Sequence, residues 1–195
     1  MIFAIFTGNL TDMKKLVLPI LLAILAVAAC SSEKTDTTLR TGAERTGEYL
    51  PLLEGKKVAV VANQTSMVGG AHLADTLLSS GTDVRLIFAP EHGFRDLADA
   101  GAVITSGADP VTGINVVSLY GAKKKPAPED LEGIDVVIFD IQDVGTRFYT
   151  YLTTMCYVME ACAENGKPFI VMDRPNPNGY YVDGPILDTA AYKSF

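Results

Sequence analysis

Five short runs of mainly apolar and β-branched residues recur along the chain, and they restrict its fold more than any other feature. Runs of this length are typical of strands that are buried on both faces of a sheet. Polar and glycine-containing stretches separate each run from the next. We expect strands at residues 57–62, 84–89, 115–119, 136–139 and 169–172.

Helix candidates lie between these runs, at residues 71–80, 128–131 and 146–165. Gly81 directly follows the first of them, and glycine commonly occupies the position just after a helix. Strands that alternate with helices form right-handed crossovers and a mostly parallel sheet. The sequence therefore predicts a Rossmann-like α/β fold, with a mostly parallel sheet and flanking helices.

Composition and missing motifs exclude several function classes. A net charge of -7 argues against nucleic-acid binding, which needs a basic surface to meet phosphates. Three Cys and two His are too few for a zinc cluster of these residues or a disulfide framework. No Gly-x-Gly-x-x-Gly follows the first predicted strand, and no Gly-Lys-Ser/Thr loop occurs. We therefore expect neither a cofactor nor a metal.

The N-terminal segment has the pattern of a secretory signal. Residues 16–29 are apolar, follow Lys14 and Lys15, and are too few for a comfortable membrane span of about 20 residues. The small residues before Cys30 resemble a bacterial lipobox, in which cleavage leaves a lipid-modified cysteine as the new N-terminus. An ordinary signal peptide and a poor anchor helix remain alternatives.

These features divide the chain into three parts. Residues 1–29 are the expected signal, with Met13 as the true start because no basic residue precedes it. Residues 30–47 are the expected lipidated cysteine and polar tether. Residues 48–195 are the expected Rossmann-like domain.

Polar side chains follow each predicted strand, and the carboxyl ends of parallel strands meet at one edge of a sheet. Ligands of open parallel sheets bind at that edge, so these segments predict a cleft. Carboxylates, amides, Arg and Tyr dominate them, and this mixture suits a sugar because hydroxyls need both donors and acceptors. The sequence has no Gly-x-Ser-x-Gly motif, and this argues against a serine hydrolase.

Glu91 is the main catalytic candidate. It lies in a short turn after the second predicted strand, between Pro90 and His92. A glutamate in apolar surroundings can act as a general acid, and a capping or ion-paired glutamate is the structural alternative. His92 can orient Glu91 or a substrate oxygen, or satisfy backbone groups.

The later strand ends carry further candidates with open roles. Asp140 and Asp143 can bind hydroxyls, hold a metal together with Asp173, or cap the helix expected near residue 146, and capping is the main expectation for Asp143. Arg147 and Arg174 can each bind a ligand carboxylate or form ion pairs. For Tyr149, packing in the core is the default expectation.

Six motifs occur in an order that resembles the exo-β-N-acetylmuramidase family of bacterial peptidoglycan recycling. The resemblance covers residues 50–195. The motifs are NQT at 63–65, PEHGFR at 90–95, SLYG at 118–121, FDIQDVG at 139–145, RFYTY at 147–151 and DRPNP at 173–177. The sequence departs from the family pattern at Asp96, where Gly is usual, and at Ala102, where Glu is usual.

The resemblance implies an exo-acting glycoside hydrolase that releases N-acetylmuramic acid from the non-reducing end of peptidoglycan fragments. It implies a smaller C-terminal α/β domain after the Rossmann-like one, with the cleft between them, so we expect this chain to be the N-terminal portion. Glu91 matches the family's proposed catalytic glutamate. The substrate-binding residues carried over are Asn63, Gln64, His92, Arg95, Asp140, Gln142, Asp143, Arg147, Tyr149, Asp173, Arg174 and Asn176.

Glu91 would protonate the glycosidic oxygen, and a second group would act at the anomeric carbon. That group is Asp140, Asp143, Asp173 or the 2-acetamido group of the substrate. With the lipobox, the resemblance implies lipid anchoring in the periplasm or at the outer membrane of a Gram-negative bacterium. The alternative function is a non-catalytic lipoprotein that binds sugars or muropeptides.

Overall fold

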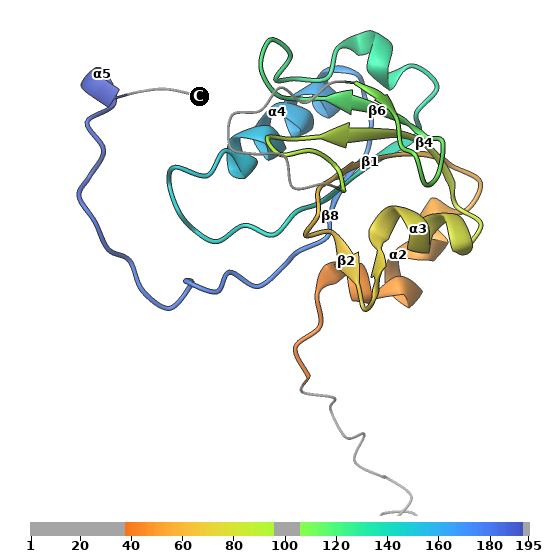
Figure 1. Ribbon diagram of the computed structural model, residues 1–195, viewed down its shortest axis with the longest axis horizontal. Coiled ribbons are helices and arrows are strands. Elements are labelled where there is room, and N and C mark those ends of the chain that lie inside the picture. Colours follow the sequence, from red (N-terminus) through yellow and green to blue (C-terminus); the bar gives the residue numbers. More distant parts are fainter. Residues whose placement is uncertain (1–37, 96–105, 193–195) are drawn as a thin grey trace, which may run out of the picture. The chain divides into compact units, whose positions relative to one another are not determined.

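The computed structural model describes residues 38–95 and 106–192. Its centre is a six-stranded sheet with the order β5-β6-β4-β1-β7-β8 (Figure 1). All neighbouring strands are parallel except β5 and β6, so the predicted fold is confirmed. The strands are β1 (Lys57–Ala62), β4 (Asp83–Ala89), β5 (Gly107–Ala108), β6 (Asn115–Ser118), β7 (Val136–Asp140) and β8 (Phe169–Val171).

Helices and a small hairpin complete the described part of the chain. The hairpin pairs two short antiparallel strands, β2 (Met67–Val68) and β3 (Ala71–His72), directly after the end of β1. The helices are η1 (Gly42–Glu44), α2 (Thr46–Leu53), α3 (Leu73–Ser79), η2 (Pro128–Leu131), α4 (Tyr151–Glu164) and α5 (Thr189–Tyr192).

Alternating side chains of β1 build a separate core on each face of the sheet. Val58 and Val60 belong to one buried cluster, which includes Leu53 of α2 and Leu77 of α3. Val61 and its neighbours on the other face belong to a second cluster, which includes residues of η2 and α4. Successive strand residues point to opposite faces, so one buried strand supports both layers.

The folded region begins earlier than the sequence indicates. Residues up to 47 were expected to be a tether, but η1 and the start of α2 lie within that range. The Gly42 amide donates a hydrogen bond of 2.7 Å to the Asp173 carbonyl, and Ala43 is fully buried. This packing against the residues after β8 orders a segment that is locally polar.

Two predicted helices also begin later than expected. The helix expected from residue 71 begins at Leu73, because residues 71 and 72 pair in the hairpin. The helix expected from residue 146 begins at Tyr151, and residues 143–150 form a loop instead. That loop shapes the functional site.

The signal-peptide interpretation, the start at Met13 and the lipidation of Cys30 all fall outside the described residues. The same holds for Asp96 and Ala102. None of the helices in the described part of the chain has the length and apolar character that a membrane crossing requires.

Candidate functional site

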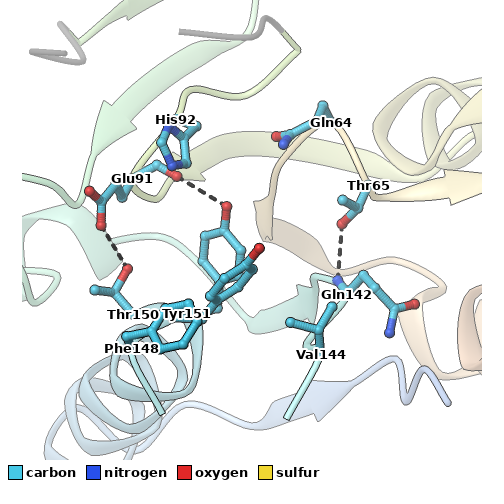
Figure 2. A pocket seen from close by; sticks show the side chains of 10 residues that line it. Gln64, Thr65, Glu91, His92, Gln142, Val144, Phe148, Thr150 and Tyr151 are labelled. Carbon is cyan, nitrogen blue, oxygen red and sulfur yellow. Dashed lines mark hydrogen bonds between the residues drawn. The ribbon is translucent and has the colours of Figure 1, made fainter. Parts of the chain in front are cut away.

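A pocket of about 550 Å³ lies at the carboxyl ends of β1, β4 and β7. Segments that follow three parallel strands meet there, as the strand-end interpretation predicts. Figure 2 shows Glu91 and His92 on one side of the pocket and Gln64, Thr65 and Gln142 on the other. The lining residues are Gln64, Thr65, Glu91, His92, Gln142, Val144, Phe148, Tyr149, Thr150 and Tyr151.

Glu91 is held from the segment where α4 begins. The Thr150 hydroxyl donates a hydrogen bond of 3.0 Å to Oε2 of Glu91 (Figure 2). The Tyr151 hydroxyl donates one of 3.4 Å to the Glu91 carbonyl oxygen. The turn itself is closed by the His92 amide, which donates to the Pro90 carbonyl at 2.7 Å. Side chain and backbone of Glu91 are therefore both fixed.

The opposite wall is a hydrogen-bonded junction between the ends of β1 and β7. The Gln142 amide donates to Oγ1 of Thr65 at 2.9 Å, and Thr65 donates to Oδ1 of Asn63 at 2.6 Å. The Gln142 side-chain nitrogen donates to the Asp143 and Pro175 carbonyls at 2.7 and 2.9 Å. This wall presents amide and hydroxyl groups, which can bind sugar hydroxyls.

Two amide side chains beside the pocket have unmet hydrogen-bonding groups. Among the described side chains, Nδ2 of Asn63 and Oε1 of Gln64 are buried without a partner. Asn63 is fully buried, whereas Gln64 lines the pocket. Native proteins usually complete such groups with water or ligand, because an unpaired buried polar group is costly.

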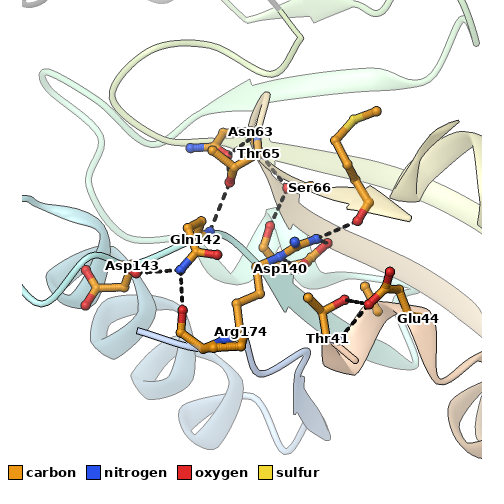
Figure 3. A network of polar contacts seen from close by, with 12 residues as sticks. Thr41, Glu44, Asn63, Thr65, Ser66, Asp140, Gln142, Asp143 and Arg174 are labelled. Carbon is orange, nitrogen blue, oxygen red and sulfur yellow. Dashed lines mark hydrogen bonds and ion pairs between the residues drawn. The ribbon is translucent and has the colours of Figure 1, made fainter. Parts of the chain in front are cut away.

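Asp140 and Arg174 pair with each other, as Figure 3 shows. Nε of Arg174 donates to Oδ1 of Asp140 at 2.6 Å, and its Nη2 donates to the Met67 carbonyl at 2.9 Å. The Ser66 hydroxyl donates to the Asp140 carbonyl. Burial raises the pKa of the Asp140 carboxyl, and the Arg174 guanidinium opposes that rise. These residues bind the strand ends together, and neither lines the pocket with Glu91.

Arg95 forms a second internal clasp. It donates to both oxygens of Asp75, at 2.5 and 2.8 Å, and to Oδ1 of Asp109 at 3.0 Å. Its guanidinium lies 4.8 Å from the centre of the Phe94 ring. The hydrogen bond from Arg95 lowers the pKa of the Asp75 carboxyl. Arg95 therefore ties α3 to the segment before β6, away from the pocket lining.

The remaining candidates lie beside the pocket. Oδ2 of Asp143 accepts from the Gly145 amide at 3.0 Å, so Asp143 closes a turn, and the helix-cap role expected for it is wrong. Asp143 and Arg147 line an adjacent hollow, where Arg147 donates to the Pro185 carbonyl at 3.0 Å. Asp173 and Asn176 line another hollow near α4.

Within the described residues, no group of three or more His, Cys, Asp or Glu side chains could hold a metal ion. The alternative of a metal held by Asp140, Asp143 and Asp173 therefore gains no support. Both carboxylate oxygens of Asp140 instead accept hydrogen bonds from Arg174.

Residues 58–195 match the family model described as the N-terminal part of the exo-beta-N-acetylmuramidase NamZ. The chain belongs to this family. It is 40% identical to the peptidoglycan beta-N-acetylmuramidase NamZ of Bacillus subtilis (strain 168) over 203 residues. That alignment covers 100% of this chain and 46% of the relative.

Two crystal structures from Bacteroides fragilis NCTC 9343 share the fold of this NamZ N-terminal domain. Both are described as DUF1343 family proteins, and each superposes with a TM-score of 0.67. One is 45% identical and covers 78% of this chain and 39% of its own. The other is 41% identical and covers 77% and 38%. The chain thus spans less than half the length of each relative it matches.

The NamZ-type pocket combines residues that the sequence indicated with residues that it did not. Tyr149 is 44% exposed at the pocket, so the expectation that it packs in the core is wrong. Thr150 and Tyr151 belong to the RFYTY motif that carries the family resemblance, and this motif is the signal that could have indicated them. Predicted residues that line the pocket are Gln64, Glu91, His92, Gln142 and Tyr149; those missed are Thr65, Val144, Phe148, Thr150 and Tyr151.

Proposed function

We propose that this protein is an exo-acting glycosidase that releases N-acetylmuramic acid from the non-reducing end of peptidoglycan fragments. Glu91 would be its general acid. The observation that carries the proposal is the position of Glu91. Its carboxyl group lines the pocket at the edge of the sheet where ligands of parallel α/β folds bind. Membership of the NamZ N-terminal family supplies the substrate class.

In this mechanism, Glu91 gives its proton to the glycosidic oxygen as the bond to the anomeric carbon breaks. The leaving sugar keeps the bonding electron pair and departs as a neutral alcohol. Gln64 and Gln142 would bind hydroxyls of the sugar from the opposite wall. General acid catalysis of this kind contributes about 10²- to 10⁴-fold to a rate.

We infer that the substrate's own acetamido oxygen attacks the anomeric carbon. Asp140 is a poor second carboxylate, because its oxygens are bound to Arg174 and it is fully buried. Asp143 and Asp173 line neighbouring hollows rather than the pocket of Glu91. Water would then open the cyclic intermediate and return a proton to Glu91, so configuration is retained. Competitive inhibition by a thiazoline mimic of that intermediate supports this route, and hydrolysis with inversion contradicts it.

The decisive experiment replaces Glu91 in the native protein and measures hydrolysis of a chromogenic N-acetylmuramide. Glu91→Gln keeps the size of the side chain but removes the transferable proton, so the rate should fall at least 100-fold. Glu54→Gln, at an exposed position after α2, is the matched control and should keep the native rate. A native rate in Glu91→Gln would contradict the assignment.

The second candidate function is binding without turnover, by a lipoprotein with the same pocket. It is favoured if the native protein is stabilised against heat by N-acetylmuramic acid yet hydrolyses no muramide. Buried amide groups without partners beside the pocket suit either function, because both require a polar ligand.

We also propose that the protein is secreted and anchored to a membrane through a lipid on Cys30. The proposal rests on the lipobox-like residues before that cysteine. Labelling of growing cells with a palmitate analogue should mark the native protein, and Cys30→Ala should abolish the label. Equal labelling of both forms would contradict the anchor.

A further inference from the structure

Two hydroxyl groups from the segment where α4 begins contact Glu91. Thr150 donates to the carboxylate of Glu91, and Tyr151 donates to its carbonyl oxygen. Tyr120 follows β6, and the nearby Glu91 carboxylate raises the pKa of its phenol. The turn after β4 is therefore held by the start of α4.

Thr150 occupies the N-cap position of α4 but does not cap the helix. A threonine at this position normally accepts a hydrogen bond from a backbone amide of the first helical turn. Here the side chain makes no cap hydrogen bond, and the backbone of Thr150 is already helical, with φ -86° and ψ -7°. The hydroxyl is instead directed to a carboxylate 59 residues earlier in the sequence.

This arrangement distinguishes the two oxygens of the Glu91 carboxyl group. Oε2 accepts the hydrogen bond from Thr150, so one of its lone pairs is occupied. In a protonated carboxyl group the carbonyl oxygen is the better acceptor, so a hydrogen bond from Thr150 to Oε2 favours the proton on Oε1. A carboxyl group held in one rotamer also keeps its proton in a fixed direction, and misplacement of a reacting group by about 1 Å can cost 100-fold in rate.

We propose that Thr150 is a positioning residue that orients the Glu91 carboxyl group for proton transfer. The inference rests on the proposed function, because it gives Thr150 a role in the same reaction. It assigns that role to a hydroxyl that touches Glu91 rather than the sugar.

The test compares Thr150→Val and Thr150→Ser in the native protein. Valine keeps the shape of threonine and removes the hydroxyl, so kcat should fall about 10- to 100-fold while KM changes less than about twofold. Serine keeps the hydroxyl and should restore kcat to within about threefold of the native value. Thr76→Val in α3 is the matched control and should keep the native kcat, because the Thr76 hydroxyl donates to the carbonyl of His72, the residue that precedes α3.

The outcomes separate this inference from the proposed function. If Glu91→Gln is inactive but Thr150→Val retains the native kcat, the positioning role is overturned and the function stands. If Thr150→Ser loses as much activity as Thr150→Val, the methyl group matters rather than the hydroxyl, and the role is again overturned. If the native protein does not hydrolyse the muramide, both are overturned. Unchanged binding of N-acetylmuramic acid to Thr150→Val, by calorimetry, shows that the variant is folded.

Discussion

The guanidinium of Arg174 holds both carboxylate oxygens of Asp140, one through Nε at 2.6 Å and the other through Nη2 at 2.9 Å. Both side chains are almost inaccessible, with exposed fractions of 8% and 0%. The same Nη2 also reaches the Met67 carbonyl, so the pair joins the segment after β8, the end of β7 and the hairpin.

Arg174→Met should therefore destabilise the protein strongly. It leaves the Asp140 carboxylate buried without its partner, which costs about 3–5 kcal/mol in the free energy of unfolding. Urea unfolding measures the loss. Arg45→Met breaks an exposed pair with Glu48 and should cost at most about 1 kcal/mol. Equal losses in the two variants would contradict the structural role of the Arg174 pair.

Gly42→Ala should destabilise the protein, although glycine to alanine is the smallest possible enlargement. A Cβ at Gly42 would lie 2.6 Å from the Asp173 amide nitrogen and 2.9 Å from the Met172 carbonyl carbon, both of them backbone atoms. Relief requires a backbone shift, so we expect a loss of about 1–3 kcal/mol.

Gly47→Ala is the control for that substitution. Gly47 lies in α2, and a Cβ there would meet no atom within 4 Å. Alanine in a helix is more stable than glycine by up to about 1 kcal/mol, so this variant should unfold at a higher urea concentration. Destabilisation of Gly47→Ala would show that α2 does not tolerate a methyl group in general.

His72 should make stability depend on pH below about 6.5, the ordinary pKa of histidine. Its Nδ1 accepts from the Ala74 amide at 3.2 Å, and its Nε2 lies 2.9 Å from the Asn63 carbonyl oxygen, which only a neutral ring with hydrogen on Nε2 satisfies. Burial lowers the pKa of His72 in the folded state. The unfolded chain therefore binds the proton first, and stability falls as pH drops below about 6.5.

Urea unfolding at about pH 7.5 and about pH 5.5 measures this effect. His72→Asn cannot take up the proton, so its free energy of unfolding should change less across the same interval. Subtraction of the two profiles removes the contribution of other titrating groups. An equal pH dependence in both proteins would show that His72 does not cause it.

Tyr149→Ala should weaken ligand binding more than folding. Tyr149 is partly exposed at the pocket, and its ring meets those of Phe148 and Tyr151 edge-on at 5.6 and 6.0 Å. Loss of an aromatic face against a sugar should raise Kd for N-acetylmuramic acid about fivefold, equivalent to about 1 kcal/mol. Calorimetry gives the Kd, and Tyr192→Ala in α5 should leave it unchanged.

The sheet could be predicted from the sequence because its strands are buried on both faces. β1 has five buried residues in succession. A short apolar run of this kind is typical of a strand that is covered on both faces of a sheet. The start of α4 could not be predicted in this way. Residues 146–150 have no local feature that forbids a helix. What places them in a loop is the turn closed by Asp143 and the distant contact between Thr150 and Glu91.

The sequence predicts which residue types gather at the carboxyl edge of the sheet, but it does not predict which of those residues pair with one another. Glu91 and Gln142 could be placed at strand ends, and both line the pocket. Arg95 and Arg174 were equally plausible ligand-binding residues until their partners were known. Arg95 pairs with Asp75, 20 residues away in the sequence, and Arg174 pairs with Asp140, 34 residues away. No local sequence pattern predicts pairs at such separations.

The position of β1 between β4 and β7 has a consequence for the order in which the sheet can form. Val58 pairs with Val84 on one side and with Val136 on the other, and Thr150, which bonds to Glu91, comes later still. β1 and β4 are close in the sequence, so they can pair before β7 joins them. Until β7 pairs, the other edge of β1 is open to association with any extended chain. Arrival of β7 therefore both completes the centre of the sheet and closes an edge that could aggregate.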